Sequence, residues 1–481
     1  MGENKKSGAR ASRTAWLTAY CVGNVGYEML YEFFKNFQNF FLTELCHFST
    51  TLTATLITIV NICKAIFTPI SGMIIDSDPF KARDKHTPWI LGMPVLLGGL
   101  YILMALLAWK GGSPTLIIVL FAIFYFLPVL LQNGYRSAIP SLSMNSNETG
   151  FLAAGINTAS NVGRLLTGII VPVIMVKMSA DGKTEDAQGF FWAVVISVII
   201  TIAVYWLSAL GVKKSIRPDR VRGADVAKAA GEKVKKNTVG LGKMIKQIFT
   251  DKNILIPFVI GLGVFFRTFI VSPTAPYYFK YITGNMMQYA TFSTATNIAG
   301  IASVIIAPII LATIGRNNVK GTILTFLGIQ ILCHLSLQLV GDNTILFIVA
   351  MTIGQFFYQG TSVLLFTAFV NAVDVTELKN RKAGNKDVAS GTAMSLHFTA
   401  VMFAQVLGGY LRNFALKQAG YVGAETVASA ALTKGLVNLY TWWPVAFLAI
   451  SVIATCFYNL TPAYMKEVHA ELDPMRAAET K

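Results

Sequence analysis

Twelve apolar stretches follow one another along the chain, and most are separated by short polar segments. A helix of about 20 mostly apolar residues is long enough to cross the hydrocarbon core of a bilayer. The stretches lie near residues 15–44, 50–75, 88–109, 115–140, 150–177, 189–211, 253–280, 287–314, 321–340, 344–373, 388–416 and 436–460. This pattern predicts an all-α membrane protein with twelve transmembrane helices.

The composition excludes the main alternatives. Hydrophobic residues make up 54% of the 481 residues and charged residues 13%, whereas soluble domains carry about 25% charged residues. A large soluble protein is therefore excluded, and so is a disordered chain, which would be poor in apolar residues. The first fourteen residues are polar and basic, with no A-x-A-like site after a short apolar core, so no cleaved signal peptide is expected.

Positive charge marks one side of the membrane. The net charge is +16, and residues 212–252 hold twelve Lys and Arg against four acids, which is half of it. With the basic N-terminal tail and the basic loops after the second, eighth and tenth spans, this predicts cytoplasmic termini in a plasma or inner membrane. The segment has no aromatic residue between 212 and 248. We therefore expect it to contact anionic lipids and not nucleic acid.

The long central segment divides the chain into two groups of six spans. Two six-helix halves joined in this way are the plan of the major facilitator superfamily. The expected domains are an N-terminal bundle (1–211), the basic loop (212–252), a C-terminal bundle (253–461) and a cytoplasmic tail (462–481). The loops after spans 2 and 8 occupy matching positions, and the first resembles the superfamily's gating loop, a Gly followed by an Asp and basic residues. This resemblance implies charged gating interactions at helix ends. The predicted gating residues are Asp76, Lys81, Arg83 and Arg316.

Four blocks of sequence are more specific indicators of a protein family. They are Tyr20-x-x-Gly23-x-x-Gly26-x-Glu28 with Phe41-Leu42-Thr43-Glu44, Pro69-x-x-Gly72-x-x-x-Asp76 with Thr87-Pro88-Trp89-Ile90, Pro276-Tyr277-Tyr278-Phe279-Lys280-Tyr281 with Gly284, and Asn371-Ala372-Val373-Asp374-Val375-Thr376-Glu377. Across nearly its whole length, the chain resembles the glycoside–pentoside–hexuronide:cation symporter family. The resemblance implies alternating access around a site near the membrane midplane.

The resemblance also implies a rewritten site. Glu28 stands where the family has an acid that binds the sugar. Lys64 and Thr68 stand where a pair of acids usually builds the cation site, and Gln132 replaces an acid shared by sugar and cation. Arg136 replaces a tryptophan that stacks on the sugar. Ser362 and Met402 replace a second such tryptophan and a lysine.

These replacements remove negative charge from the site and add positive charge. Sodium needs hard oxygen ligands that usually carry negative charge, and the ammonium of Lys64 would repel it. No sodium site or other metal site is therefore expected. A buried charge needs a partner, so we expect Lys64 to act as a tethered cation paired with Glu28, and both to take part in coupling together with Thr68.

Charged residues inside spans are functional candidates. Glu28, Glu32 and Lys35 share one helical face. The predicted substrate-binding residues are Glu28, Gln132, Arg136, Tyr27, Tyr31, Arg164, Arg267 and His397. All of these except Gln132 have a structural alternative: Glu28, Arg164 and Arg267 in ion pairs, Arg136 extending to the interface, and His397 and the tyrosines in packing.

No hydrolase, zinc-protease or nucleotide-binding motif is present, so neither an enzyme nor an ATP-driven pump is expected. The sequence predicts a monomeric secondary transporter without a cofactor. Its expected solute is anionic or amphipathic, such as a uronide, a sulfonated sugar or a steroid conjugate. Its transport is proton-coupled or cation-independent. The alternatives are a sodium- or proton-coupled symporter of a neutral glycoside and a non-transporting membrane sensor.

Overall fold

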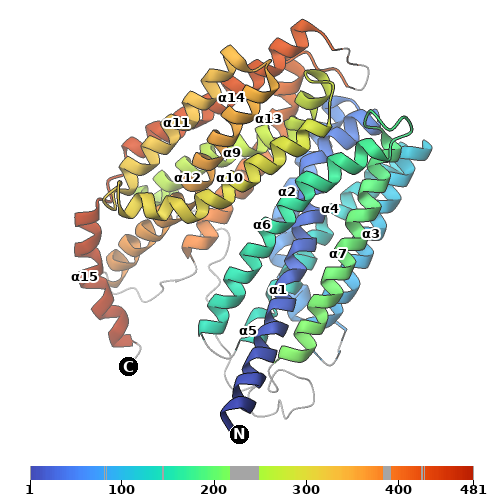
Figure 1. The fold of residues 1–481 in the computed structure, drawn as a ribbon. Coiled ribbons are helices and arrows are strands. Elements are labelled where there is room, and N and C mark those ends of the chain that lie inside the picture. Colours follow the sequence, from blue (N-terminus) through green and yellow to red (C-terminus); the bar gives the residue numbers. More distant parts are fainter. Residues whose placement is uncertain are drawn as a thin grey trace. The chain divides into compact units, whose positions relative to one another are not determined.

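The computed structural model describes residues 2–77, 79–80, 82, 84–143, 146–216, 249–382, 392–423, 426 and 428–479. These ranges are largely helical and contain no strand (Figure 1). The helices are α1 (Gly2–Phe40), α2 (Thr50–Asp76), α3 (Thr87–Lys110), α4 (Pro114–Arg136), α5 (Ile139–Leu142), α6 (Ser146–Lys177), α7 (Ala187–Ser215), α9 (Lys252–Tyr281), α10 (Met287–Ala312), α11 (Val319–Val340), α12 (Thr344–Lys382), α13 (Thr392–Gln418), α14 (Ala430–Cys456) and α15 (Pro462–Glu479). A π-helical segment, η1 (Phe41–Leu45), continues α1.

Local chemistry explains several helix boundaries. Short polar side chains cap backbone N–H groups at helix starts, as Ser49 does for α2 and Asp186 for α7. The expected span near 115–140 is divided between α4 and α5. Pro140 lies in the first turn of α5, and a proline cannot donate the backbone hydrogen bond that would continue α4 past Arg136.

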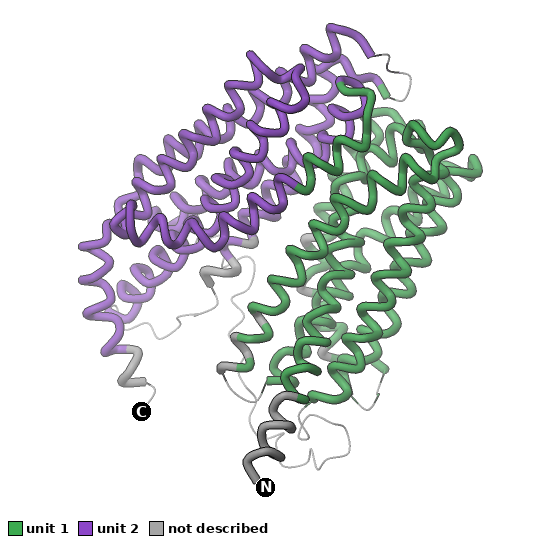
Figure 2. The backbone as a smooth tube through the Cα atoms, in the orientation of Figure 1, with its two compact units in different colours: residues 1–234, 283–294, 423–425 green, residues 235–282, 295–422, 426–481 purple. Residues whose placement is uncertain are grey.

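Helices α1–α7 form the first of two compact units, drawn in green in Figure 2. Within it, α1 packs against α6 and α7, α3 packs against α4 and α7, and α2 packs against α4. Two buried tyrosines join α1 to α4 reciprocally: Tyr20 donates to the carbonyl of Tyr135 at 2.6 Å, and Tyr135 donates to the carbonyl of Tyr20 at 2.5 Å. These contacts fix the middle of α1, where the charged residues lie.

The second unit contains α9, most of α10, and α11–α15 (Figure 2). Its packing repeats that of the first unit, because the first helix, α9, contacts the fifth and sixth, α13 and α14. The expected tail beyond residue 461 is helical: α15 packs against α12 and buries Met465, Val468 and Leu472. A 3.1 Å contact between His469 and Asp374 joins the same two helices.

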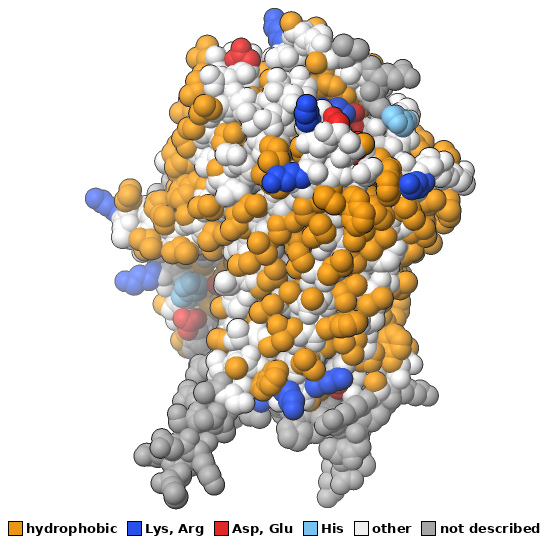
Figure 3. All heavy atoms as spheres, turned by 45° about the vertical axis from the view of Figure 1, so that its right-hand side comes forward, with side chains coloured by type: hydrophobic (Ala, Val, Ile, Leu, Met, Phe, Trp, Pro, Cys, Tyr) orange, Lys and Arg blue, Asp and Glu red, His pale blue; other side chains and the backbone are white. Residues whose placement is uncertain are grey.

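Ten helical segments in the described ranges are long and apolar enough to cross a membrane. The other two predicted spans correspond to α1 and α13, which are also long enough but are not among those ten; α1 carries Glu28, Glu32 and Lys35. On the face shown in Figure 3, hydrophobic side chains gather over the middle of the helices, and many Lys and Arg lie toward the helix ends. This surface suits a lipid environment.

Some predictions concern residues outside the described ranges. Lys81 and Arg83 lie outside them, as does the side chain of Asp76, the last residue of α2. Most of the basic segment, residues 217–248, also lies outside them. Arg316 is described: it is exposed in the turn between α10 and α11, with a positive φ of 48°.

Candidate functional site

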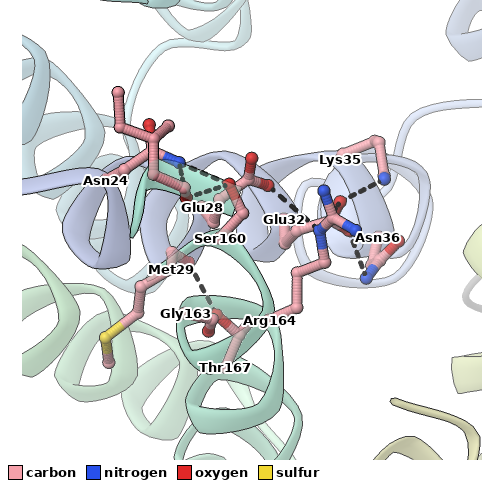
Figure 4. A network of polar contacts seen from close by, with 11 residues as sticks. Asn24, Glu28, Met29, Glu32, Lys35, Asn36, Ser160, Gly163, Arg164 and Thr167 are labelled. Carbon is pink, nitrogen blue, oxygen red and sulfur yellow. Dashed lines mark hydrogen bonds and ion pairs between the residues drawn. The ribbon is translucent and has the colours of Figure 1, made fainter. Parts of the chain in front are cut away.

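The centre of the first unit holds an ion pair between α1 and α6. Nε of Arg164 donates to Oε2 of Glu28 at 3.3 Å, and it lies 3.7 Å from Oε1 of Glu32 (Figure 4). The Glu28 side chain is 8% exposed, whereas that of Arg164 is 36% exposed. The Arg164 side chain, which is partly exposed, therefore lies near one buried carboxylate, that of Glu28, and one partly buried carboxylate, that of Glu32.

The same face of α1 adds a second cation. Nζ of Lys35 donates to Oε1 of Glu32 at 2.5 Å, and the amide of Asn36 donates to Oε2 at 3.3 Å (Figure 4). We call Glu28, Glu32, Lys35, Asn36 and Arg164 the α1–α6 ion cluster. Its two carboxylates balance its two cations, so the cluster is neutral as a whole.

Close helix packing positions this cluster. Thr167 of α6 donates to the carbonyl of Met29 at 3.0 Å, and Asn24 is hydrogen-bonded to Ser160 (Figure 4). Gly163 lies between these contacts. A Cβ there would be 2.5 Å from the carbonyl oxygen of Val25 and 2.9 Å from Cβ of Glu28, so only glycine permits this approach.

Lys64 of α2 lies apart from that cluster, against aromatic rings. Its Nζ donates to the hydroxyl of Tyr31 at 3.0 Å and lies 4.9 Å from the Tyr31 ring centre and 5.7 Å from that of Tyr125. Asn61 accepts a 2.9 Å hydrogen bond from Tyr125. The expected pairing of Lys64 with Glu28 is wrong, since Arg164 pairs with Glu28, and Lys64 makes no ion pair among the described residues.

Gln132 and Arg136 lie together on α4, as their i, i+4 spacing predicts. The Gln132 amide oxygen accepts from Nε and Nη2 of Arg136 at 2.8 and 2.9 Å; this orientation follows because a guanidinium can only donate. Arg136 is exposed at the end of α4. The guanidinium of Arg136 is bound by an uncharged amide, so Gln132 does not neutralise its positive charge.

Three further candidates make structural contacts, two within one helix and one between two helices. The hydroxyl of Thr68 donates to the carbonyl of Lys64 on its own helix at 2.8 Å. Tyr27 stacks on Tyr31 with 5.4 Å between ring centres. His397 packs edge-on against Phe265 at 5.1 Å. These contacts support the structural alternative for each residue.

In the second unit, Arg267 is a candidate predicted from the sequence. The residues that it contacts in the structure were not predicted. Arg267 is 1% exposed and donates to His334 and Gln355. His334 has no motif around it, so its only sequence signal is a polar residue within an apolar span. Asn24, Asn61 and Ser160 in the first unit were missed for the same reason.

Within the described ranges, no group of three or more His, Cys, Asp or Glu side chains could hold a metal ion. The residues found together are instead cations, aromatic rings and two carboxylates. This set can bind charged or hydroxylated organic groups through hydrogen bonds.

The comparisons with known proteins agree with this fold. A family model described as "MFS/sugar transport protein" matches residues 19–462. The chain therefore belongs to this family of the major facilitator superfamily and is a membrane transporter, not an enzyme. This confirms the fold class and the family predicted from the sequence.

Curated relatives are distant but cover most of the chain. An isoprimeverose transporter from Lactiplantibacillus pentosus is 23% identical over 96% of this chain and 91% of its own length. A lactose permease from Lactobacillus delbrueckii subsp. bulgaricus is 24% identical over 86% of this chain and 64% of its own length, so the chain spans under two thirds of that longer protein. A putative 2,3-dihydroxypropane-1-sulfonate exporter from Salmonella typhimurium is 21% identical over 95% of each chain.

Solved structures show the same fold. A bacterial homologue of the lysosomal transporter Spinster, in an inward-facing state, matches with a TM-score of 0.61 at 13% identity, over 95% of this chain and 98% of its own. A D-xylose–proton symporter also matches with a TM-score of 0.61 at 13% identity, over 93% of this chain and 97% of its own. The family model and the curated relatives, together with this fold, make the protein an integral membrane protein of the secondary-transporter type with a small-molecule substrate.

Proposed function

We propose that this transporter moves a small organic solute that carries an anionic group, and that it does so without sodium. The observation that carries the proposal is the environment of Lys64. Its ammonium lies against Tyr31 and Tyr125 and makes no ion pair among the described residues. A cation without an acidic partner favours an anionic ligand.

The same environment argues against sodium binding. Sodium is held by several hard oxygen ligands, usually including carboxylates. The hydroxyl of Tyr31, 3.0 Å from Nζ of Lys64, already accepts a hydrogen bond from the ammonium. The sulfonate named for the Salmonella relative supports an anionic solute, whereas the sugars named for the other two relatives support the alternative, a neutral glycoside.

Proton coupling through Glu28 is the second part of the proposal. Protonation of Glu28 would remove the charge that pairs with Arg164 and leave Arg164 to Glu32, which is 3.7 Å away. An ion pair that one proton can break allows Arg164 to take two discrete arrangements, one with Glu28 and one with Glu32. A coupling element requires two such states.

Uptake into proteoliposomes tests both parts. Labelled 2,3-dihydroxypropane-1-sulfonate, a glucuronide and lactose are compared with sodium, potassium or choline outside, with and without a pH gradient. We expect uptake of an anionic solute that is equal in the three salts and faster with an inward proton gradient. Sodium-stimulated lactose uptake would overturn the proposal. Independence from the pH gradient would reject the proton part and favour facilitated diffusion. Binding of solutes without any uptake would indicate a sensor.

A further inference from the structure

A buried arginine lies in the interior of the second unit. Arg267 on α9 is 1% exposed. Its Nε donates to Nε2 of His334 on α11 at 3.1 Å, and its Nη1 donates to Oε1 of Gln355 on α12 at 2.8 Å. The guanidinium carbon lies 5.1 Å from the ring centre of Tyr358. We call Arg267, His334, Gln355 and Tyr358 the Arg267 cluster.

The partners of His334 fix its protonation. Its Nδ1 lies 2.8 Å from the carbonyl oxygen of Tyr440, which can only accept, so Nδ1 carries the hydrogen. Its Nε2 faces the N–H of Arg267, which can only donate, so Nε2 carries none. His334 is therefore neutral, and a second proton would break its contact with Arg267 and place two cations together.

The cluster consequently has a charge of +1 with nothing to balance it nearby. Arg267 makes no ion pair with any described residue. The described acids of the second unit lie in loops, at the end of α12 or on α15: Asp251, Asp342, Asp374, Glu377, Glu467, Glu471 and Asp473. An uncompensated buried charge is costly, so a structural arginine would be expected to have an acid beside it.

One donor of Arg267 is also unused. Its Nη2 is buried and has no hydrogen-bond partner among the residues that the structure describes. It faces Gly354 of α12, where a Cβ would lie 3.5 Å from Nη2 and 3.6 Å from Cβ of Cys333. An added Cβ would make ordinary van der Waals contact there, so the glycine leaves room for about one carbon atom beside Nη2. A guanidinium presents its donors as a fork that suits an oxyanion.

We propose that the Arg267 cluster binds a small anionic group during the transport cycle. That ligand is either the carboxylate or sulfonate of the solute or a free inorganic anion such as chloride. The cluster is closed to solvent in this structure, and alternating access supplies the states in which a ligand reaches it. The inference rests on the proposed function for the solute as source, but binding is measurable without transport.

Thermal unfolding of the purified full-length protein tests this inference. The protein is kept in a zwitterionic buffer of low ionic strength and receives 2,3-dihydroxypropane-1-sulfonate, sodium chloride or, as a neutral control, lactose. We expect the sulfonate, chloride or both to raise the melting temperature, and Arg267→Gln to abolish that response. Stabilisation by the sulfonate identifies the solute as the source, and stabilisation by chloride alone identifies a free anion.

Gln330→Met is the matched control. Gln330 lies one turn before His334 on α11, is also buried, and is hydrogen-bonded to Thr361 at 3.0 Å. We expect this variant to lose stability but to keep the full anion response. If Arg267→Gln fails to fold, Arg267→Lys is the second variant, because lysine keeps the positive charge but lacks the guanidinium fork. Its apparent anion affinity should fall about tenfold. That loss matches one charge-assisted hydrogen bond.

Two results would overturn the inference: no anion response in the wild-type protein, or an unchanged affinity in Arg267→Lys with a retained response in Arg267→Gln. Either would indicate a structural arginine whose Nη2 is satisfied by buried water. The proposed function is judged separately. If sulfonate uptake persists unchanged in Arg267→Gln, the proposed function stands, and the inference fails for the solute as the ligand of the cluster. If lactose uptake proves sodium-stimulated, the proposed function fails while an anion response through Arg267 still stands.

Discussion

The carboxylate of Glu28 on α1 accepts a 3.3 Å hydrogen bond from Arg164 on α6, far away in the sequence. The approach of the two helices depends on Gly163, the residue directly before Arg164. The ion pair and the packing that permits it are therefore adjacent. A substitution that disturbs the packing at Gly163 should therefore disturb the ion pair. Loss of the ion pair should disturb the packing less.

Gly163→Ala tests the packing. Its Cβ would collide with the backbone of Val25, and overpacking of this kind costs about 1–3 kcal/mol. We expect a lower melting temperature and slower uptake. Gly99→Ala is the control, since a Cβ at Gly99 on α3 meets nothing within 4 Å; it should be as stable as the wild type or more stable, because alanine favours helix. Equal stability of the two variants would contradict the packing argument.

Replacement of Glu28 by Gln and of Arg164 by Gln tests the pair. Hydrogen bonds to charged groups contribute about 1.5–3 kcal/mol, so each single change should weaken solute binding or uptake about ten- to a hundredfold. In a double-mutant cycle, the double variant should lose much less than the sum of the two single losses. Additive losses measured by uptake in proteoliposomes would show that the two side chains act separately. Loss of the pH-gradient effect in Glu28→Gln alone would assign the proton to Glu28.

Lys64→Gln tests the role of the tethered cation. Without the ammonium, we expect uptake of an anionic solute to fall about tenfold or more, as for the loss of one charged contact, while sodium still has no effect. Lys110→Gln is matched to it, because Nζ of Lys110 also lies over an aromatic ring, 3.7 Å from that of Trp109, but at the end of α3. Uptake that is equally reduced in both variants would show a general effect of charge.

Thr68→Val separates the resemblance from the structure. The resemblance places Thr68 at a coupling position, but its hydroxyl donates to the carbonyl of Lys64 within α2, as threonines commonly do inside helices. We expect uptake and its response to a pH gradient to remain within about threefold of the wild type, less than the tenfold that 1.4 kcal/mol represents. A larger loss, in a variant of normal stability, would show that the hydroxyl leaves the backbone during transport.

The fold was predictable because hydrophobic length is a local property. Each apolar stretch must satisfy its backbone hydrogen bonds inside the membrane, so each forms a helix whatever its neighbours are. Helix ends depend on more specific chemistry, and the division of the span near 115–140 at Pro140 and the helical α15 were not anticipated. The neighbouring positions of Gln132 and Arg136 could be predicted, because an i, i+4 spacing fixes them within one helix.

The sequence by itself determined an all-α membrane transporter of this family and identified most of the charges placed inside the spans. Only the tertiary structure decided how those charges pair. Glu28 could have met Lys64 or Arg164, since both lie on other helices, and the close packing of α1 on α6 at Gly163 selected Arg164. His334 became significant for the same reason: its contact with Arg267 joins α11 to α9, and no local pattern specifies which faces of two distant helices meet.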